Sequence, residues 1–186
     1  GSRESRSSLA FQIALLLGQD GLTNGAIYAL LALALVLVFA VTRIIFIPQG
    51  EFVAYGALTL AMLQAGKLPA TLWMIAALGA AIVVIDGAIA IRHGAARRLP
   101  RIVLSNLGVP LALLLIVPNI NAAGLPLVAQ IALTLAVVVP LGPMIYRLAY
   151  QPIAEAPVLI LLIVSVAVHV VLIGLGLLFF GAEGTR

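Results

Sequence analysis

Apolar stretches long enough to cross a lipid bilayer follow one another from about residue 21 to residue 180 of this chain. Charged residues make up only 9% of the 186 positions, and the mean hydropathy is +1.27. A soluble domain of this length needs a polar shell, which this composition does not supply. The sequence therefore predicts an all-α integral membrane protein, whose function is limited to transport, conduction, intramembrane enzymology or assembly.

The apolar stretches predict a polytopic transmembrane helix bundle of about six spans. We expect them at about residues 22–42, 50–66, 69–91, 102–118, 125–146 and 157–180. Each is close to the roughly 17–25 residues that the hydrocarbon core requires. Pro140 and Pro143 lie inside the fifth span and predict a kink there. The apolar segment 9–19 is too short to span alone and is expected to be a short N-terminal interfacial segment.

The basic residues predict the orientation of the bundle. Four of the arginines fall in one short segment between two apolar stretches: Arg92, Arg97, Arg98 and Arg101. The positive-inside rule predicts that such a loop lies in the cytoplasm. The protein is accordingly expected in the cell (inner) membrane. No aromatic residue lies among these arginines, so nucleic-acid binding is not expected despite the net charge of +4.

Several kinds of chemistry are not expected from this composition. The chain has no cysteine, which excludes disulfides and thiolate sites. Two distant histidines and a few carboxylates do not supply a metal constellation. No glycine-rich phosphate loop is present, so ATP is expected to bind to a separate subunit. The sequence predicts no catalytic residues, no cofactor and no metal site, and therefore no enzyme.

Two segments resemble a known family of permeases. Residues 20–34 read DGLTNGAIYALLALA, and the segments 42–45 (TRII) and 49–57 (QGEFVAYGA) follow. Residues 146–152 read YRLAYQP and lead into the last apolar stretch. This pattern resembles the permeases of branched-chain amino acid ABC importers of the high-affinity Liv type. The resemblance covers residues 20–66 and 125–183.

The resemblance implies four regions and a set of partners. Residues 1–19 would be a tail with the interfacial segment, 20–66 the first permease helices, 67–124 an inserted helix pair, and 125–186 later permease helices of a truncated N-terminal half. The implied partners are a second permease subunit, cytoplasmic ATPase subunits and a periplasmic substrate-binding protein, with membrane lipid around them. The family's N-F-A-H turn is replaced by residues 46–49 here, so roles of that Asn and His do not carry over.

The residues predicted to line a substrate path are polar or small residues of the first two spans. They are Asn24, Tyr28, Gln49, Gly50, Glu51 and Tyr55. A charge at the bilayer centre costs roughly 2.5–3.5 kcal/mol on insertion scales and normally faces protein or water. The alternative for Glu51 is an interfacial carboxylate neutralised by Arg43. The alternative for Asn24 and Tyr28, four residues apart on one helix face, is hydrogen bonding between helices.

Two further polar pairs are interpreted as structural. Asp86 lies in the third span, within reach of Arg92 if the helix end frays. Ser165 and His169, four residues apart, are interpreted as helix-contact hydrogen-bonding residues, with a proton relay as the alternative.

The leading hypothesis is a permease subunit that forms part of the translocation path of an ABC importer for branched-chain or related amino acids. A secondary transporter or channel subunit not driven by ATP is the alternative, and a truncated assembly module is the third possibility.

Overall fold

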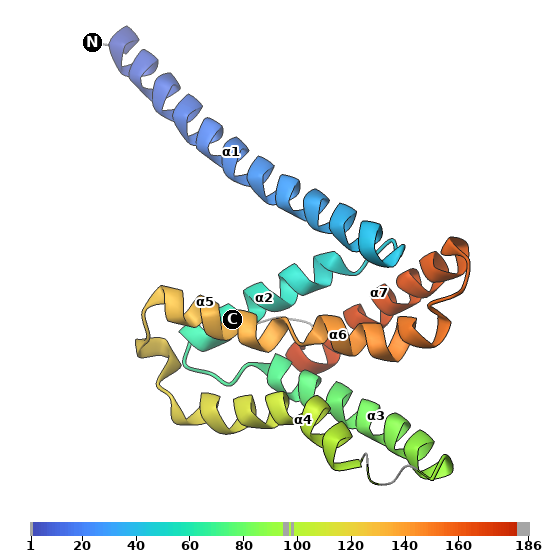
Figure 1. Cartoon of the computed structure of the whole chain (residues 1–186). Coiled ribbons are helices and arrows are strands. Elements are labelled where there is room, and N and C mark those ends of the chain that lie inside the picture. The colour runs from blue at the N-terminus through green and yellow to red at the C-terminus, as the bar shows by residue number, and fades with distance from the viewer. Residues whose placement is uncertain (1, 95–96, 98, 182–186) are drawn as a thin grey trace. The chain divides into compact units, whose positions relative to one another are not determined.

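The structure is a computed structural model that describes residues 2–94, 97 and 99–181, with side chains from residue 11 onward. It is all-α, and the described part contains five helices long and apolar enough to cross a membrane. The chain is a multi-span helical membrane protein. It divides into two compact units, Gly1–Phe46 and Ile47–Arg186; Figure 1 draws their helices.

The first unit is built on one helix, α1, which runs unbroken from Ser2 to Thr42. At 1.5 Å per residue its 41 residues extend about 62 Å, roughly twice the hydrocarbon thickness. The expected separation of segment 9–19 from the first span is therefore wrong. The segment contains no proline, and a glycine such as Gly21 costs a helix only about 1 kcal/mol. Arg43, the residue after the helix, has a φ of 58°, a left-handed capping conformation.

The second unit contains the remaining helices. They are α2 (Gln49–Gln64), α3 (Ala70–Arg92), α4 (Leu99–Ile116), α5 (Leu127–Val138), α6 (Leu141–Ile145) and α7 (Val158–Phe180). Short 3-10 turns at Val117–Asn119 and Ala122–Gly124 connect α4 to α5. A π-helical turn, Tyr146–Tyr150, and a 3-10 turn, Gln151–Ile153, follow α6.

The α2–α3 connection lies where turn chemistry predicted it. Gly66 has a φ of +66°, which a residue without a side chain adopts at little cost. Its N–H donates to Leu63 O, and the Lys67 N–H donates to Met62 O, the two bonds of a Schellman motif. Pro69 then precedes the first residue of α3. The end of α2 and the start of α3 are therefore both determined by residues next to them in the sequence.

Helix α3 is the central helix of the second unit. It packs against α2, α4, α5, α6 and α7, and its Leu72, Met74 and Ile75 are fully buried. Its closest partner is α4, which lies beside it in Figure 1. At Gly79 a Cβ atom would lie 2.7 Å from the Asn106 carbonyl oxygen, so only glycine fits this crossing. The residues interpreted as an inserted pair thus include the helix on which the unit is assembled.

The α-helix of the fifth span is interrupted where the kink was predicted. Helix α5 ends at Val138, and α6 begins at Leu141 after Pro140. Proline has no N–H to donate to the preceding turn and its ring crowds the carbonyl four residues back, so the α-helix is interrupted there. A single π-helical turn follows, and its Tyr150 is buried.

Five of the six expected spans correspond to helices of spanning length, and one does not. The segment Leu127–Ile153 counts as one span of 27 residues despite its kink. Helix α2 has 16 residues and extends about 24 Å, less than the ~30 Å hydrocarbon core. The expectation of a full span at 50–66 is therefore wrong, and the structure has a short helix there. The boundaries proposed at residues 19, 66 and 124 stay predictions.

Candidate functional site

Helix α2 begins level with the middle of α7. The Ile47 N–H, just before α2, donates to Ser165 Oγ at 3.0 Å. One turn later, Glu51 Oε1 lies 2.9 Å from His169 Nδ1. Ser165 and His169 are the eighth and twelfth of the 23 residues of α7, about 10 and 16 Å from its first residue. The start of α2, with the irregular backbone before it, therefore lies beside the middle of α7.

The two helices run parallel beyond this point. The Tyr55 hydroxyl donates to the Leu172 carbonyl oxygen, and the Tyr55 ring stacks on Phe180 with centroids 6.1 Å apart. A Cβ at Gly176 would lie 3.3 Å from the Tyr55 ring, so this glycine gives the ring its space. Tyr55 is 3% exposed and anchors α2 against the second half of α7.

Ser165 connects three elements through one hydroxyl group. It is fully buried, and its Oγ accepts from the Ile47 N–H and, at 3.1 Å, from the Tyr150 hydroxyl of the π-helical turn. An unpaired backbone N–H at this depth costs free energy comparable to a lost hydrogen bond. Ser165 therefore stabilises the non-helical segment that precedes α2.

The Glu51–His169 pair is the ionisable centre of this site. The Glu51 side chain is 15% exposed and that of His169 is 34% exposed. The two atoms are at ion-pair distance but are not aligned as a hydrogen bond, and Glu51 Oε2 has no hydrogen-bond partner among the described residues. Such a carboxylate can accept a proton, a cation or a donor of a solute. The structure gives His169 as its neighbour, whereas Arg43, the neutralising group expected from sequence, belongs to the other unit.

A second charged pair joins α3 to the π-helical turn. Asp86 Oδ2 lies 2.6 Å from Arg147 Nη2. The expectation that Asp86 pairs with Arg92 is therefore wrong. Asp86 lies more than one turn before the end of α3, and the π-helical turn brings a partner from a different helix. The pair lines a cavity of about 330 Å³.

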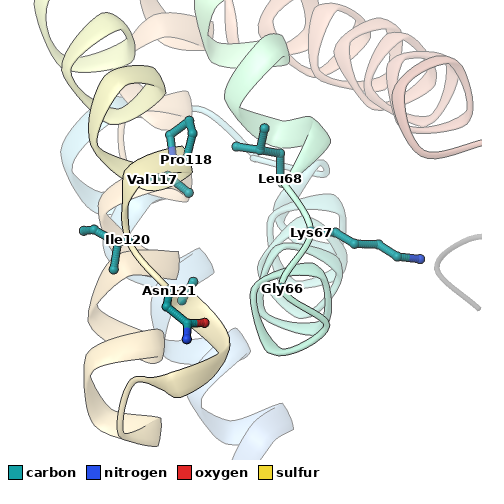
Figure 2. A pocket seen from close by; sticks show the side chains of 8 residues that line it. Gly66, Lys67, Leu68, Val117, Pro118, Ile120 and Asn121 are labelled. Carbon is teal, nitrogen blue, oxygen red and sulfur yellow. The ribbon is translucent and has the colours of Figure 1, made fainter.

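A further cavity, of about 270 Å³, lies between the α2–α3 turn and the α4–α5 connection. Figure 2 shows that the Lys67 side chain points away from it. Gln130 Nε2 donates to the Ala122 and Leu125 carbonyl oxygens at 3.0 and 3.2 Å, which fixes the connection. This cavity has no charged group directed into it and is a weaker candidate than the α2–α7 site.

The predicted path residues fall into two groups. Asn24 and Tyr28 are exposed side chains of α1, in the first unit. In the second unit, Gln49 and Gly50 open α2, next to Glu51 and Tyr55. Their role in transport stays a prediction. Sequence reasoning did not place Tyr150 in this site, and it separated Ser165 and His169 from Glu51.

Comparisons of the chain with protein-family models, with curated proteins and with solved structures give no match. The resemblance to Liv-type permeases stays a prediction. Within the described ranges, no three His, Asp or Glu side chains come together in a way that could hold a metal ion.

Proposed function

We propose that this chain is a permease subunit of an ABC importer for branched-chain or related amino acids and that the start of α2 lines its translocation path. The assignment to this transporter class rests on the resemblance of residues 20–66 and 125–183. The assignment of the path rests on the geometry around Glu51. In the proposed assembly, a second permease completes the path, ATPase subunits drive it from the cytoplasm, and a periplasmic binding protein delivers the solute.

The observation that carries the proposal is a helix that begins beside the middle of α7, next to Ser165 and His169. Irregular backbone at membrane depth is tolerated where protein or a water-filled cavity covers it. Broken helices of this kind form the binding sites of many transporters, because the helix end exposes backbone groups to a polar solute. In this chain the segment Arg43–Pro48 is non-helical, and α2 starts at Gln49.

The charges at this helix end support the same conclusion. A carboxylate and an imidazole placed beside the middle of an apolar helix lower the stability of the inserted protein unless they are paired, and such residues usually have a function. Here the pairing is incomplete, since one Glu51 oxygen has no partner among the described residues. The surrounding aliphatic side chains of α7 suit an aliphatic solute, and the polar pair suits its charged groups.

Substitution of Glu51 tests the proposal. Glu51→Gln keeps the size and hydrogen bonding but removes the charge, and Glu51→Leu removes both. We expect Glu51→Leu to abolish uptake of branched-chain amino acids in vesicles that contain the complete transporter, and Glu51→Gln to be intermediate. The yield of detergent-extracted complex controls for insertion and assembly. Uptake at the wild-type rate by Glu51→Leu, at normal yield, would contradict the role of this residue.

The Glu51–His169 pair also favours a second candidate, a secondary transporter coupled to protons. Two titratable groups 2.9 Å apart in an apolar bundle can bind and release a proton during transport. An uncoupler applied while ATP is maintained separates the two mechanisms. Uptake that continues supports the ATP-driven importer, and uptake that stops supports the proton-coupled transporter.

A further inference from the structure

The cavity beside Asp86 and Arg147 combines two opposite charges with an apolar wall. It has a volume of about 330 Å³ and lies between α3 and the π-helical turn. Ile82, Ile85 and Ile89 of α3 form the apolar wall. The net charge of the two ionic side chains is zero, which suits a ligand that carries one positive and one negative group.

The charged end of this cavity lies near the ends of two candidate spanning segments. Asp86 is six residues before the end of α3 at Arg92, and Arg147 is six residues before the end of its span at Ile153. Along α3, six residues correspond to about 9 Å, a depth from which long side chains reach the headgroup region. The side chain of Arg147 is 41% exposed and that of Asp86 is 21% exposed, so both can be reached by a ligand.

An apolar groove adjoins the cavity on the side of the membrane interior. Leu148 lines both, and Leu78 of the groove lies one turn from Ile82 of the cavity along α3. The groove has a volume of about 250 Å³ and continues along α7 past Ala167. A ligand that fills both spaces needs a zwitterionic head and a hydrocarbon tail.

We propose that Asp86, Arg147 and this groove bind one phospholipid whose headgroup carries a phosphate and a primary ammonium. The guanidinium of Arg147 has five N–H donors, so donors remain for the phosphate beside its contact with Asp86. Asp86 Oδ2 is buried against Arg147 Nη2, so the ammonium donates to the accessible part of the Asp86 carboxylate, whose side chain is 21% exposed. One acyl chain lies in the apolar groove.

Lipid retention by the intact protein tests this site. The full chain is reconstituted in nanodiscs with equal amounts of phosphatidylethanolamine, phosphatidylcholine and phosphatidylglycerol of identical acyl chains, then extracted and measured by native mass spectrometry. We expect phosphatidylethanolamine to be retained about tenfold over phosphatidylcholine, whose quaternary ammonium has no N–H to donate. Tenfold corresponds to about 1.4 kcal/mol. Equal retention of the three lipids overturns the proposal.

Variants assign the retained lipid to this site. Asp86→Asn is expected to reduce the preference over phosphatidylcholine, and Arg147→Gln to reduce retention of all three lipids. Arg92→Gln, an exposed arginine at the end of α3, is the matched control and is expected to change nothing. If Arg92→Gln loses as much lipid retention as Arg147→Gln, lipids are attracted to surface positive charge in general, and the proposed site is wrong.

Two further measurements keep the test decisive if the charge variants unfold. Ala167→Phe fills the apolar groove from an exposed position of α7 and leaves the ion pair in place. It is expected to reduce lipid retention at unchanged thermal stability, and full retention contradicts the acyl-chain position. Addition of free leucine tests the rival ligand, a small zwitterionic solute. Displacement of the retained lipid by leucine would mean that the cavity binds the solute.

Discussion

Replacement of Ser165 by alanine tests how the start of α2 is held at its depth. The Ser165 hydroxyl is fully buried and accepts hydrogen bonds from the Ile47 N–H at 3.0 Å and from the Tyr150 hydroxyl at 3.1 Å. Ser165→Ala removes both acceptor contacts and leaves two donors without this partner. The change in volume is small, so the effect reports hydrogen bonding more than packing.

The magnitude follows from these two bonds. Loss of the Tyr150 bond is expected to cost about 0.6 kcal/mol, the average for hydrogen bonds between membrane helices, and loss of the acceptor for the Ile47 N–H about 1–3 kcal/mol. We therefore expect Ser165→Ala to lower the free energy of unfolding by about 1–3 kcal/mol. The assay is reversible unfolding in mixed detergent micelles, followed by helical circular dichroism.

Two comparisons make this result specific. Ser105→Ala is the matched control, because Ser105 is exposed and its hydrogen bonds stay within its own helix: it donates to Ile102 O and accepts from Asn106 Nδ2 at 3.2 Å. We expect it to change stability by less than about 0.5 kcal/mol. A double-mutant cycle with Tyr150→Phe isolates the Tyr150–Ser165 bond. If Ser165→Ala costs no more than Ser105→Ala, the proposed anchoring of the segment before α2 is wrong.

The remaining predictions concern helix packing and orientation. Gly79→Ala is expected to destabilise the protein by about 1–3 kcal/mol, because the new Cβ would lie 2.7 Å from the Asn106 carbonyl oxygen. The neutral control in the same unfolding assay is Gly174→Ala, whose Cβ would have no atom within 4 Å. A single cysteine at His93, exposed at the C-cap of α3, is expected to react with an impermeant thiol reagent only from the cytoplasmic side. Labelling from the periplasmic side would contradict the predicted orientation of the bundle.

Local signals predicted much of the fold from sequence. Pro69 and the Schellman glycine Gly66 fix the end of α2 and the start of α3 within a few residues, and Pro140 fixes the interruption of the fifth span. These features depend on neighbouring residues alone. The continuity of α1 was not predicted, although the segment contains no proline and a glycine such as Gly21 costs a helix only about 1 kcal/mol.

The partners of the charged residues could not be predicted in the same way. Asp86 was expected to pair with Arg92, its neighbour in sequence, yet its partner comes from the π-helical turn that follows the kink. The position of Glu51 along the bundle could not be predicted from sequence either, because it depends on where α2 packs along α7. Both outcomes are set by tertiary packing between segments distant in the chain. The Arg-rich loop was predicted from charge alone, and its residues 95, 96 and 98 lie outside the described residues.

Water access to the start of α2 tests the central claim most directly. The chain has no native cysteine, so a single cysteine can be placed at Gly50, where a Cβ meets no atom within 4 Å. The control is a cysteine at Val170, the neighbour of His169 in sequence and 62% exposed on α7. A thiol reacts as the thiolate, which forms in water but not in lipid.

Both variants are treated in membrane vesicles with a small hydrophilic thiol reagent, and the labelled fraction is measured with and without branched-chain amino acids. A polar path predicts rapid labelling at Gly50, slowed by the solute, and little labelling at Val170 at the same depth. An unreactive cysteine at Gly50, or equal labelling at the two positions, would contradict the claim that α2 opens onto a water-accessible path.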